Sequence, residues 1–450
     1  MTAMNQDLTR GPVMRSMLLF AIPMILGDLL QQCYNVADTL IVGRFVGTNA
    51  LAAVGSSYSL MTFLTSILLG LCMGSGALFS MHFGRRDPDG LRESLVSSFA
   101  LIAVVAVVLN ILSFACLDWI QVFLQVPDEV WGLMRQYLAI IFTGIPAIFL
   151  YNYFASFLRA VGNSVVPLAF LAVSACLNIV LDLYFVLGLG RSVGGAAEAT
   201  VISQYVSGIG ILIYTLARRT EFRGLGQYLR LRPGCLKEVA SYSFLTCIQQ
   251  SVMNLGILMV QGLVNSFGPT VMAAFAAAVK IDSFAYLPVQ DFGNAFSTFI
   301  AQNYGAKDAG RIRAGLKGAA FTSIGFGVVL SVLVWVFAAP LMGLFVDAGE
   351  AAVIAEGVRY LHIEGAFYFG IGCLFLLYGL YRALGRPGMS VVLTVISLGT
   401  RVALAYLLSA TPLGVVGIWW SVPIGWALAD IAGVGYYLLR KKRLLSWSDE

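Results

Sequence analysis

The sequence predicts an all-α, polytopic membrane protein made of two pseudo-symmetric halves. Of its 450 residues, 59% are hydrophobic and only 11% are charged, whereas a soluble domain averages about 45–50% and about 25%. Apolar runs of roughly 20 residues, the length that crosses a bilayer as a helix, recur along the chain. Residues 43–87 also match residues 264–308, 221 positions later, and residues 158–164 match 381–387, 223 positions later. Two duplicated membrane halves of this kind usually enclose a central site.

Twelve of these runs are expected to be transmembrane helices, six in each half. Those of the first half lie at 16–42, 48–80, 94–117, 131–157, 164–189 and 196–217. Those of the second half lie at 239–266, 269–302, 315–338, 352–380, 388–410 and 413–439. We therefore expect an N-terminal six-helix lobe at 1–217 and a C-terminal six-helix lobe at 239–450, joined by a basic cytoplasmic linker at 218–238.

The basic residues predict the orientation, because Lys and Arg in short loops stay on the cytoplasmic side of a membrane. With a cytoplasmic N-terminus, the inside segments carry 22 of the 28 Lys and Arg, including Arg230 of the linker. The outside segments carry acidic residues instead: Asp118, Asp128, Glu129, Asp347 and Glu350. Both termini are therefore expected in the cytoplasm, in a multi-pass protein of the cytoplasmic (inner) membrane.

Composition also limits the partners. The net charge of +5 is explained by the basic loops, which face anionic headgroups, so membrane lipids are expected partners and nucleic acid is not. The seven cysteines show no CxxC spacing, which is typical of packing residues rather than of disulfides or a metal site. No cofactor and no obligatory protein partner are indicated.

Polar residues inside the apolar runs are informative, because a charge at the bilayer centre costs at least about 2.5–3.5 kcal/mol. In the first run, four polar residues share one helical face: Gln31, Tyr34, Asn35 and Asp38. In the fifth run, Ser174, Asn178 and Asp182 follow at four-residue intervals. In the sixth, Thr200 lies in GGAAEATVIS, whose small residues permit close helix contact.

Asp38, Asn178, Asp182 and Thr200 together would make an all-oxygen site for a proton or a sodium ion. Two carboxylates crowded in an apolar place do not both stay charged, so the pair can load and unload one cation. The other interpretation is structural, with Asp38 and Asp182 acting as hydrogen-bond partners of Asn178 and Thr200. A neutral pair would serve that purpose with a smaller desolvation penalty.

The later runs of the second half carry more acids than bases. Asp282, Asp291, Glu364 and Asp430 stand against Lys280 and Arg401. This balance predicts an ion-paired network with a spare carboxylate. Lys280 and Asp282 are interpreted either as a buried structural pair or as substrate contacts.

A substrate path is expected between the halves, where apolar walls with a few polar groups suit amphipathic molecules. Its candidate residues, for each of which helix packing is the alternative interpretation, are Gln31, Tyr34, Asn35, Gln250, Met253, Asn254, Lys280 and Asp282. Pro23 interrupts the hydrogen bonding of the first helix. It is interpreted either as a hinge below Asp38 or as a static kink of the kind that membrane helices tolerate.

The chain resembles the multidrug and toxic compound extrusion (MATE) transporters over essentially its full length. The resemblance rests on TRGPV at 9–13, FAIPMILGDLLQQCYNVADTLIVGRFVG at 20–47, ALAAVG at 50–55, FLRAVGNS at 157–164, LNIVLD at 177–182 and GGAAEATVIS at 194–203. It implies a V-shaped pair of six-helix bundles that exports organic, often cationic, compounds in exchange for protons or sodium ions. The family's N-terminal-lobe cation site falls on Asp38, Asn178, Asp182 and Thr200.

The resemblance is closer to the bacterial DinF-like and MepA-like branch than to the NorM-like branch. NorM-like relatives carry a glutamate in the seventh helix, whereas this chain has Gln249, Gln250 and Asn254 there. A coupling-ion site in the second lobe is therefore not predicted.

Three other functions were considered. A lipid-linked oligosaccharide flippase of the same wider superfamily would line its cavity with cationic residues to hold a pyrophosphate, and the first, second and seventh helices carry almost none. An intramembrane enzyme would need paired acidic or histidine motifs, and the chain has two histidines and no HExxH or DDxxD. A receptor or channel would show a pore-lining carbonyl loop or a long signalling loop. The sequence contains neither.

Overall fold

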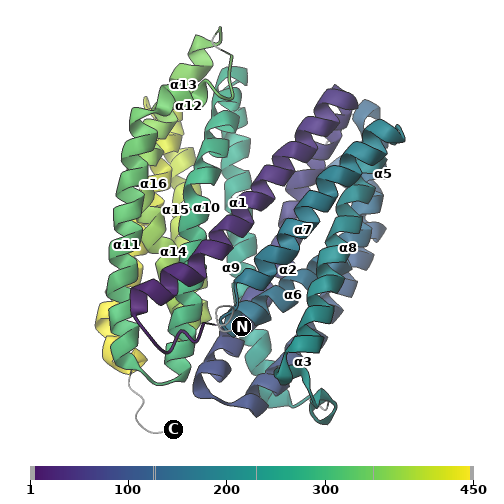
Figure 1. Ribbon diagram of the computed structural model, residues 1–450. Coiled ribbons are helices and arrows are strands. Elements are labelled where there is room, and N and C mark those ends of the chain that lie inside the picture. Colours follow the sequence, from purple (N-terminus) through teal and green to yellow (C-terminus); the bar gives the residue numbers. More distant parts are fainter. Residues whose placement is uncertain (1–5, 125, 127, 230, 348, 446–450) are drawn as a thin grey trace. The chain divides into compact units, whose positions relative to one another are not determined.

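The computed structural model describes residues 6–124, 126, 128–229, 231–347 and 349–445 (Figure 1). Within these ranges the chain is helical and contains no strand. Twelve helical spans are long and apolar enough to cross a membrane. The prediction of an all-α protein with twelve transmembrane helices is thereby confirmed. Arg230 of the basic linker lies outside the described residues.

The helices follow the order that the duplication predicts. The first half contains α1 (Val13–Phe45), α2 (Thr48–Arg85), α3 (Pro88–Ala115), α4 (Leu117–Leu124), α5 (Asp128–Ile141), η1 (Phe142–Gly144), α6 (Ile145–Ala160), α7 (Val165–Asp182), η2 (Leu183–Gly188), α8 (Ser192–Arg218), η3 (Thr220–Phe222) and η4 (Leu225–Tyr228). The second half contains α9 (Pro233–Asn265), α10 (Pro269–Gly305), α11 (Ala309–Val336), α12 (Ala338–Met342), α13 (Ala351–Glu364), η5 (Gly365–Phe367), α14 (Tyr368–Ala383), α15 (Pro387–Ser409) and α16 (Val415–Leu444).

The duplication is visible in how two helices begin. Asp87 caps α3 by accepting a hydrogen bond from the Gly90 amide at 2.9 Å. Asp308, 221 positions later, caps α11 by accepting one from the Arg311 amide at 2.8 Å. A carboxylate at this position satisfies one of the amides that a helix start leaves free. The same turn chemistry therefore sets the third span of each half.

Two helices that were predicted to be continuous are broken at equivalent places. The runs 131–157 and 352–380 each contain a 3₁₀ turn, η1 and η5. In the first half, Pro146 follows η1 and supplies no backbone donor. In the second half, the Tyr368 amide donates to Ser331 Oγ at 3.2 Å instead of continuing the helical ladder. The missing donor at Pro146 and the side-chain bond at Tyr368 explain the two breaks, which the hydropathy of the sequence does not indicate.

The chain packs as two compact units. The first unit consists of Met1–Asp7 and Ile22–Cys247, and the second consists of Leu8–Ala21 and Ile248–Glu450. Both boundaries between long segments fall within helices, in α1 and in α9. The lobes expected from the sequence, 1–217 and 239–450, stay a prediction.

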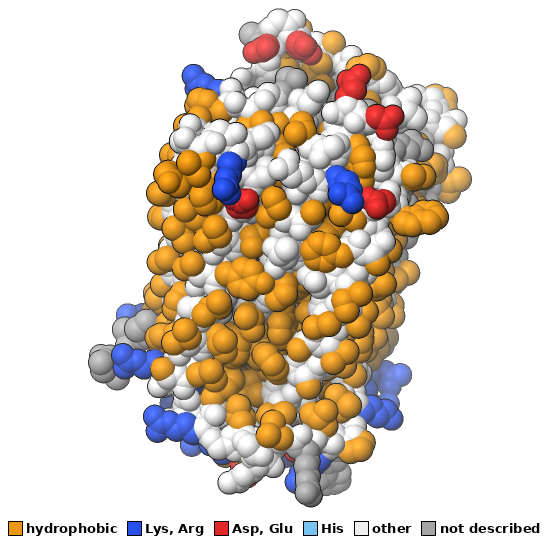
Figure 2. All heavy atoms as spheres, turned by 90° about the vertical axis from the view of Figure 1, so that its right-hand side faces the viewer, with side chains coloured by type: hydrophobic (Ala, Val, Ile, Leu, Met, Phe, Trp, Pro, Cys, Tyr) orange, Lys and Arg blue, Asp and Glu red, His pale blue; other side chains and the backbone are white. Residues whose placement is uncertain are grey.

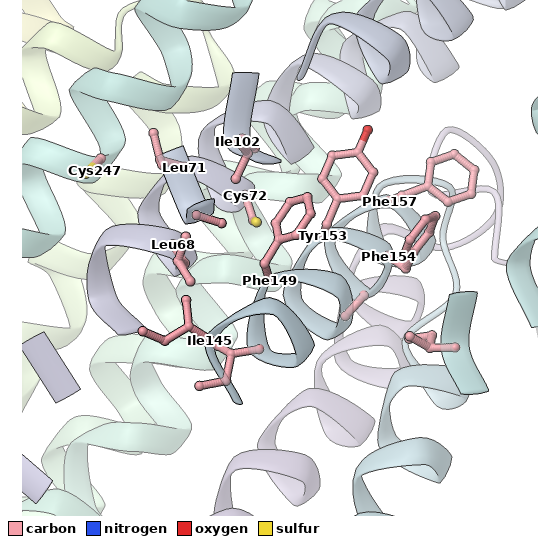
Figure 3. Close-up of a cluster of buried hydrophobic side chains, with 14 of the residues drawn as sticks. Leu68, Leu71, Cys72, Ile102, Ile145, Phe149, Tyr153, Phe154, Phe157 and Cys247 are labelled. Carbon is pink, nitrogen blue, oxygen red and sulfur yellow. The ribbon is translucent and has the colours of Figure 1, made fainter. Parts of the chain in front are cut away.

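Aromatic side chains fill the core of the first unit (Figure 3). Phe79 of α2 packs edge-on against Tyr153 of α6, with ring centroids 6.1 Å apart. The Tyr153 hydroxyl donates to the Leu95 carbonyl at 2.7 Å, which satisfies its polar end inside the core. Gly74 lets α2 approach α9 closely, because a Cβ there would lie 2.3 Å from the Tyr242 carbonyl oxygen.

The core of the second unit is organised around Trp419 of α16. Its ring stacks on Phe275 at 5.5 Å and meets Tyr360 edge-on at 4.9 Å. The Trp419 Nε1 donates to Glu356 Oε1 at 2.9 Å. This packing fixes Tyr360 of α13, whose hydroxyl contributes to a polar cluster described below.

The surface has the distribution expected of a membrane protein. Figure 2 shows a face whose middle is covered largely by hydrophobic side chains, with Asp and Glu toward one end and mostly Lys and Arg at the other. Large apolar side chains are widely exposed, for example Trp119 at 75% and Phe321 at 83%. A lipid environment explains such exposure, because water would penalise it.

Candidate functional site

The first unit brings two carboxyl groups together. Asp38 comes from α1 and Asp182 from the last position of α7, and the two carboxyl groups interact electrostatically with each other. Asp182 is fully buried and Asp38 is half-buried. Both are predicted from helical spacing, from the cost of a charge inside the bilayer and from the family resemblance, although spacing could not show that the two helices meet here.

Asn178 and Thr200 join the same site. One helical turn before Asp182, the Asn178 Nδ2 donates to Thr200 Oγ1 at 3.3 Å. Thr200 in turn donates to the Ala196 carbonyl at 3.0 Å within α8. Asn178 is 2% exposed, so its amide is directed by these contacts and not by solvent. The structure therefore brings Asp38 to Asp182 and Asn178 to Thr200, and one turn of α7 separates Asn178 from Asp182.

Several oxygens of this site are buried without a donor. Among the described residues, no hydrogen bond reaches Asp38 Oδ1, either carboxylate oxygen of Asp182, or Asn178 Oδ1. Buried polar atoms are normally bonded, and leaving one unpaired is unfavourable by about 1–3 kcal/mol. An array of unpaired oxygens on facing carboxyl groups is suited to a shared proton or to a hard cation.

Two tyrosines surround the carboxyl pair. Tyr34 of α1 and Tyr137 of α5 both interact electrostatically with Asp38 and Asp182. Tyr34 was predicted as a substrate residue. Tyr137 was not singled out, since a tyrosine in an apolar run gives no periodic signal of its own. The only available signal was the duplication, which puts Tyr360 of the second unit 223 positions later.

The backbone changes its winding directly after Asp182. Residues Leu183–Gly188 form a π-helix, η2, and the Leu189 amide bonds to the Tyr184 carbonyl five residues back at 3.0 Å. Short π-helical segments occur frequently at functional sites. The predicted run at 164–189 contained no signal for this change.

The other predicted substrate residues of the first half lie along α1. Gln31 is exposed and Asn35 is half-buried. The Asn35 carbonyl accepts a hydrogen bond from Thr39 Oγ1 at 2.8 Å. Pro23 lies inside the same helix, which continues unbroken from Val13 to Phe45.

The predicted residues of α9 lie in the second unit. Gln250 is buried, whereas Met253 and Asn254 are half-buried. The Asn254 Nδ2 donates to the Gln250 carbonyl at 3.2 Å, one turn earlier in the same helix. This hydrogen bond lies within α9 and uses the side-chain nitrogen of Asn254. The side-chain oxygen of Asn254 takes no part in it.

The second unit has a separate acidic cluster around Asp282 of α10. Tyr360 donates to Asp282 Oδ2 at 2.5 Å, and Tyr368 donates to Oδ1. Lys280 is exposed and lies over the Phe345 ring, with Nζ 6.0 Å from its centroid. Throughout the part of the chain that is described, no ion pair joins Lys280 to Asp282. The buried pair considered from the sequence is therefore not formed, because residues two apart point to different sides of a helix.

Glu364 and Arg401 complete this cluster. Glu364 is 5% exposed, and it interacts electrostatically with both Asp282 and Arg401. Arg401 stands 223 positions after Asn178, so an arginine replaces the amide at the corresponding place of the second half. Among the described residues, no ion pair joins Arg401 to either acid, so the ion-paired network with a spare carboxylate stays a prediction.

A conventional metal centre is not evident in the described residues. They contain no group of three or more His, Cys, Asp or Glu that could hold a metal ion. The oxygen-rich site at Asp38 and Asp182 has only two such residues and relies on an amide and a hydroxyl for the rest. This donor set fits a proton or a sodium ion better than a transition metal, which prefers nitrogen and sulfur ligands.

Comparisons with known proteins agree with this architecture. The MatE family model matches residues 23–184 and 243–407. The probable multidrug resistance protein YpnP of Bacillus subtilis is 28% identical over 432 residues, which covers 96% of each chain. The multidrug export protein MepA of Staphylococcus aureus is 24% identical over 450 residues, covering 98% of this chain and 97% of MepA.

A solved structure extends the agreement to the fold. An outward-facing multidrug resistance MATE family transporter superposes with a TM-score of 0.92 at 23% identity, covering 97% of this chain and 98% of the other. The family model alone matches most of the chain, in one block from each half. The resemblance noted in the sequence is thereby confirmed. This chain belongs to the MatE family and is a membrane transporter of the multidrug efflux class, not an enzyme.

Proposed function

We propose that this transporter is an antiporter that exports organic, cationic or amphipathic compounds in exchange for protons or sodium ions. The observation that carries the proposal is the carboxyl pair of Asp38 and Asp182. Three of its four oxygens are buried without a hydrogen-bond donor in the described part of the chain. Two carboxylates this close repel each other in an apolar surrounding, which favours uptake of one proton or cation.

Asn178 and Thr200 hold the remaining ligands of the proposed ion site. The Asn178 amide nitrogen is engaged by Thr200, so its carbonyl oxygen is the atom free to face an ion. A proton would be shared between the two carboxyl groups. A sodium ion would take carboxylate and amide oxygens, the ligand type that hard cations prefer. No other cofactor enters the proposal.

The ion would drive transport by binding one conformation more tightly than the other. In the proposed cycle, Asp38 and Asp182 take the ion from outside, the protein changes conformation and the substrate leaves. Release of the ion to the cytoplasm then restores the form that accepts substrate. Only a difference in ion affinity between the two conformations can shift their populations.

Pro23 is the proposed hinge of this change. The residues of α1 before Ile22 belong to the second unit, and those from Ile22 onward, with Asp38, belong to the first. Proline removes one hydrogen bond from the helical ladder. A bend is therefore easiest where the helix passes from one unit to the other. A static kink is the alternative, and unchanged coupled transport by Pro23→Ala would favour it.

Substrate contacts are proposed for Gln31, Tyr34, Asn35, Gln250, Met253, Asn254, Lys280 and Asp282. They differ in availability. Gln31 and Lys280 are exposed, whereas both oxygens of Asp282 already accept tyrosine hydrogen bonds. A cationic substrate could use Asp282 only by displacing or joining those donors. Small organic molecules and membrane lipids are the proposed partners.

The experiment that tests the proposal measures efflux of a fluorescent cationic dye from proteoliposomes. Sodium and proton gradients are imposed separately on wild type, on Asp38→Asn and on Asp118→Asn. Asp118 is the matched control, because its carboxylate is exposed and paired with Arg135 at 2.9 Å. We expect dye movement to follow one gradient, to be lost in Asp38→Asn and to persist in Asp118→Asn.

Two results would contradict the proposal. Wild-type efflux by Asp38→Asn would remove this carboxyl pair from the coupling mechanism. Dye movement that is independent of both gradients would remove antiport itself.

A further inference from the structure

The five residues before α1, Leu8–Pro12, are docked on the second unit and take no part in the proposed ion site. Leu8 is fully buried. Its amide donates to Gln302 Oε1 at 3.1 Å, and its carbonyl accepts from Asn303 Nδ2 at 3.1 Å. Gln302 and Asn303 are themselves fully buried on α10. Buried side chains thus hold the backbone of this N-terminal segment.

Arg311 of α11 makes most of the contacts to the segment. Its Nη1 donates to the Gly11 carbonyl at 2.8 Å, and its Nη2 donates to those of Leu8 and Arg10 at 3.0 and 3.2 Å. Its Nε donates to Asn303 Oδ1 at 3.0 Å. The Arg311 guanidinium therefore binds the carbonyls of Leu8, Arg10 and Gly11. It also binds Asn303, whose side chain bonds to Leu8. This use of a planar fork is specific to arginine.

Among the described residues, the first half does not repeat these arginine contacts, although the duplication provides the same positions. Gly90 stands where Arg311 stands, 221 residues earlier. A Cβ at Gly90 would lie 2.2 Å from Asp87 Oδ2 and 2.5 Å from His82 Nδ1, so a longer side chain there would displace these two groups. Leu229, the counterpart of Leu8, is 69% exposed, whereas Leu8 is 0% exposed. In the described part of the first half, the corresponding segment is bonded to α3 by other side chains, Tyr228 to Asp89 Oδ1 at 2.5 Å and Arg232 to Glu93 Oε2 at 3.3 Å.

The segment leads directly into the part of α1 that belongs to the second unit. Residues Leu8–Ala21 are assigned to that unit, and the chain passes to the first unit at Ile22. Met14 packs so closely on α11 that a Cβ at Gly318 would lie 2.2 Å from its sulfur. Met17 and Phe20 are buried. The start of α1 is therefore held by side-chain packing and, just before it, by the Arg311 contacts.

We propose that Arg311 is a positioning residue of the transport cycle. By fixing residues 8–12, it makes the start of α1 move with the second unit, so that a conformational change bends α1 near Pro23 instead of pulling its first turns loose. This inference rests on the proposed antiport function. It concerns the protein's own N-terminal segment and not a ligand, so Arg311 should affect the maximal rate and not the affinity for substrate.

Dye efflux from proteoliposomes tests the transport consequence, with Arg311→Ala, Arg311→Lys and Arg313→Ala compared with wild type. Arg313 is the matched control, because it is an exposed arginine two residues away on the same helix. We expect the maximal rate to fall at least tenfold in Arg311→Ala with the dye KM within twofold. Arg311→Lys keeps the positive charge but lacks the planar guanidinium, so its maximal rate should be as low as that of Arg311→Ala. Arg313→Ala should stay within twofold of wild type.

A distance measurement tests the docking independently of transport. Spin labels are placed at Arg15→Cys and Ala314→Cys, both exposed and both in the second unit, after replacement of the native cysteines. We expect one narrow distance distribution in wild type, unchanged by the driving gradient, and a broad distribution in Arg311→Ala. A narrow distribution in Arg311→Ala, or its transport at the wild-type rate, would overturn the proposal.

A second variant, with an insertion, keeps the proposal testable if Arg311→Ala fails to fold. Gly-Ser-Gly inserted between Pro12 and Val13 keeps every Arg311 contact but separates the docked segment from α1. We expect the insertion to lower the maximal rate as Arg311→Ala does, and a wild-type rate would overturn the proposal. A wild type that shows no gradient-driven efflux would instead contradict the antiport function, while the label distances would still decide whether Arg311 holds the segment.

Discussion

At the scale of single residues, the two units treat buried carboxyl groups in opposite ways. Asp182 receives no hydrogen bond within the described ranges, whereas Asp282 accepts one tyrosine hydroxyl on each oxygen. A carboxylate that is already satisfied gains little from binding an ion. A buried carboxylate without a hydrogen-bond donor gains much more stability when it binds an ion. The difference favours Asp182 as the exchangeable site and Asp282 as an ordered part of the core.

The sequence indicated the acids of both clusters but not their hydroxyl partners. Asp38, Asn178 and Asp182 were predictable because polar residues in an apolar run are few and these recur there at helical spacing. Tyr360 and Tyr368 come from other helices, and nothing in the sequence distinguishes them among its 19 tyrosines. Only the packed structure shows that these hydroxyls reach Asp282.

The tyrosine bonds to Asp282 predict a stability effect. Tyr368→Phe leaves Asp282 Oδ1 buried without its donor, since the phenyl ring keeps the shape but loses the hydroxyl. We expect the free energy of unfolding to fall by about 1–3 kcal/mol. The control is Tyr406→Phe, because Tyr406 is 51% exposed, and it should change stability by less than about 0.5 kcal/mol. Denaturant unfolding in detergent measures both. Equal stability of the two variants would show that the Asp282 bond is not stabilising.

At the scale of helices, the sequence predicted which segments span the membrane but not where their hydrogen bonding changes. The twelve apolar runs of the sequence correspond to twelve helices that are long and apolar enough to cross a membrane. A helix needs about 20 mostly apolar residues to cross the bilayer. The break at η5 accompanies a single bond, that of the Tyr368 amide to Ser331 Oγ, and the break at η1 precedes a proline. Hydropathy averaged over a whole span does not detect such bonds.

Close helix contacts inside the first unit predict a contrast between two glycines of α2. A Cβ at Gly74 would lie 2.3 Å from the Tyr242 carbonyl oxygen, whereas one at Gly55 meets nothing within 4 Å. Gly74→Ala should therefore force α2 and α9 apart and lower the unfolding free energy by about 1–3 kcal/mol. Gly55→Ala should raise it by about 0.5–1 kcal/mol, because alanine suits a helix interior better. Thermal unfolding of the two variants in one detergent compares them, and a destabilisation shared by both would contradict the steric argument.

At the scale of the whole molecule, the two packing units exchange the ends of two helices. α1 begins with the second unit and continues in the first, and α9 begins with the first unit and continues in the second. The sequence placed the division at the basic linker 218–238, because charge shows where a chain leaves the membrane. Charge does not show which helices pack together. The chain therefore passes between the two units within α1, within α9 and between Asp7 and Leu8, and not in the basic linker.

The predicted orientation can be tested on single-cysteine proteins. Cys116 follows α3 and is exposed, next to the acidic segment expected outside. Lys441 lies in the basic last turn of α16, which is expected in the cytoplasm because Lys and Arg stay on that side. In intact cells, a membrane-impermeant maleimide should label a protein that retains only Cys116. It should label a protein whose single cysteine is Lys441→Cys only after the membrane is permeabilised. Labelling of Lys441→Cys in intact cells, with protection of Cys116, would mean that the termini face outward, and the proposed direction of ion and substrate movement would then be reversed.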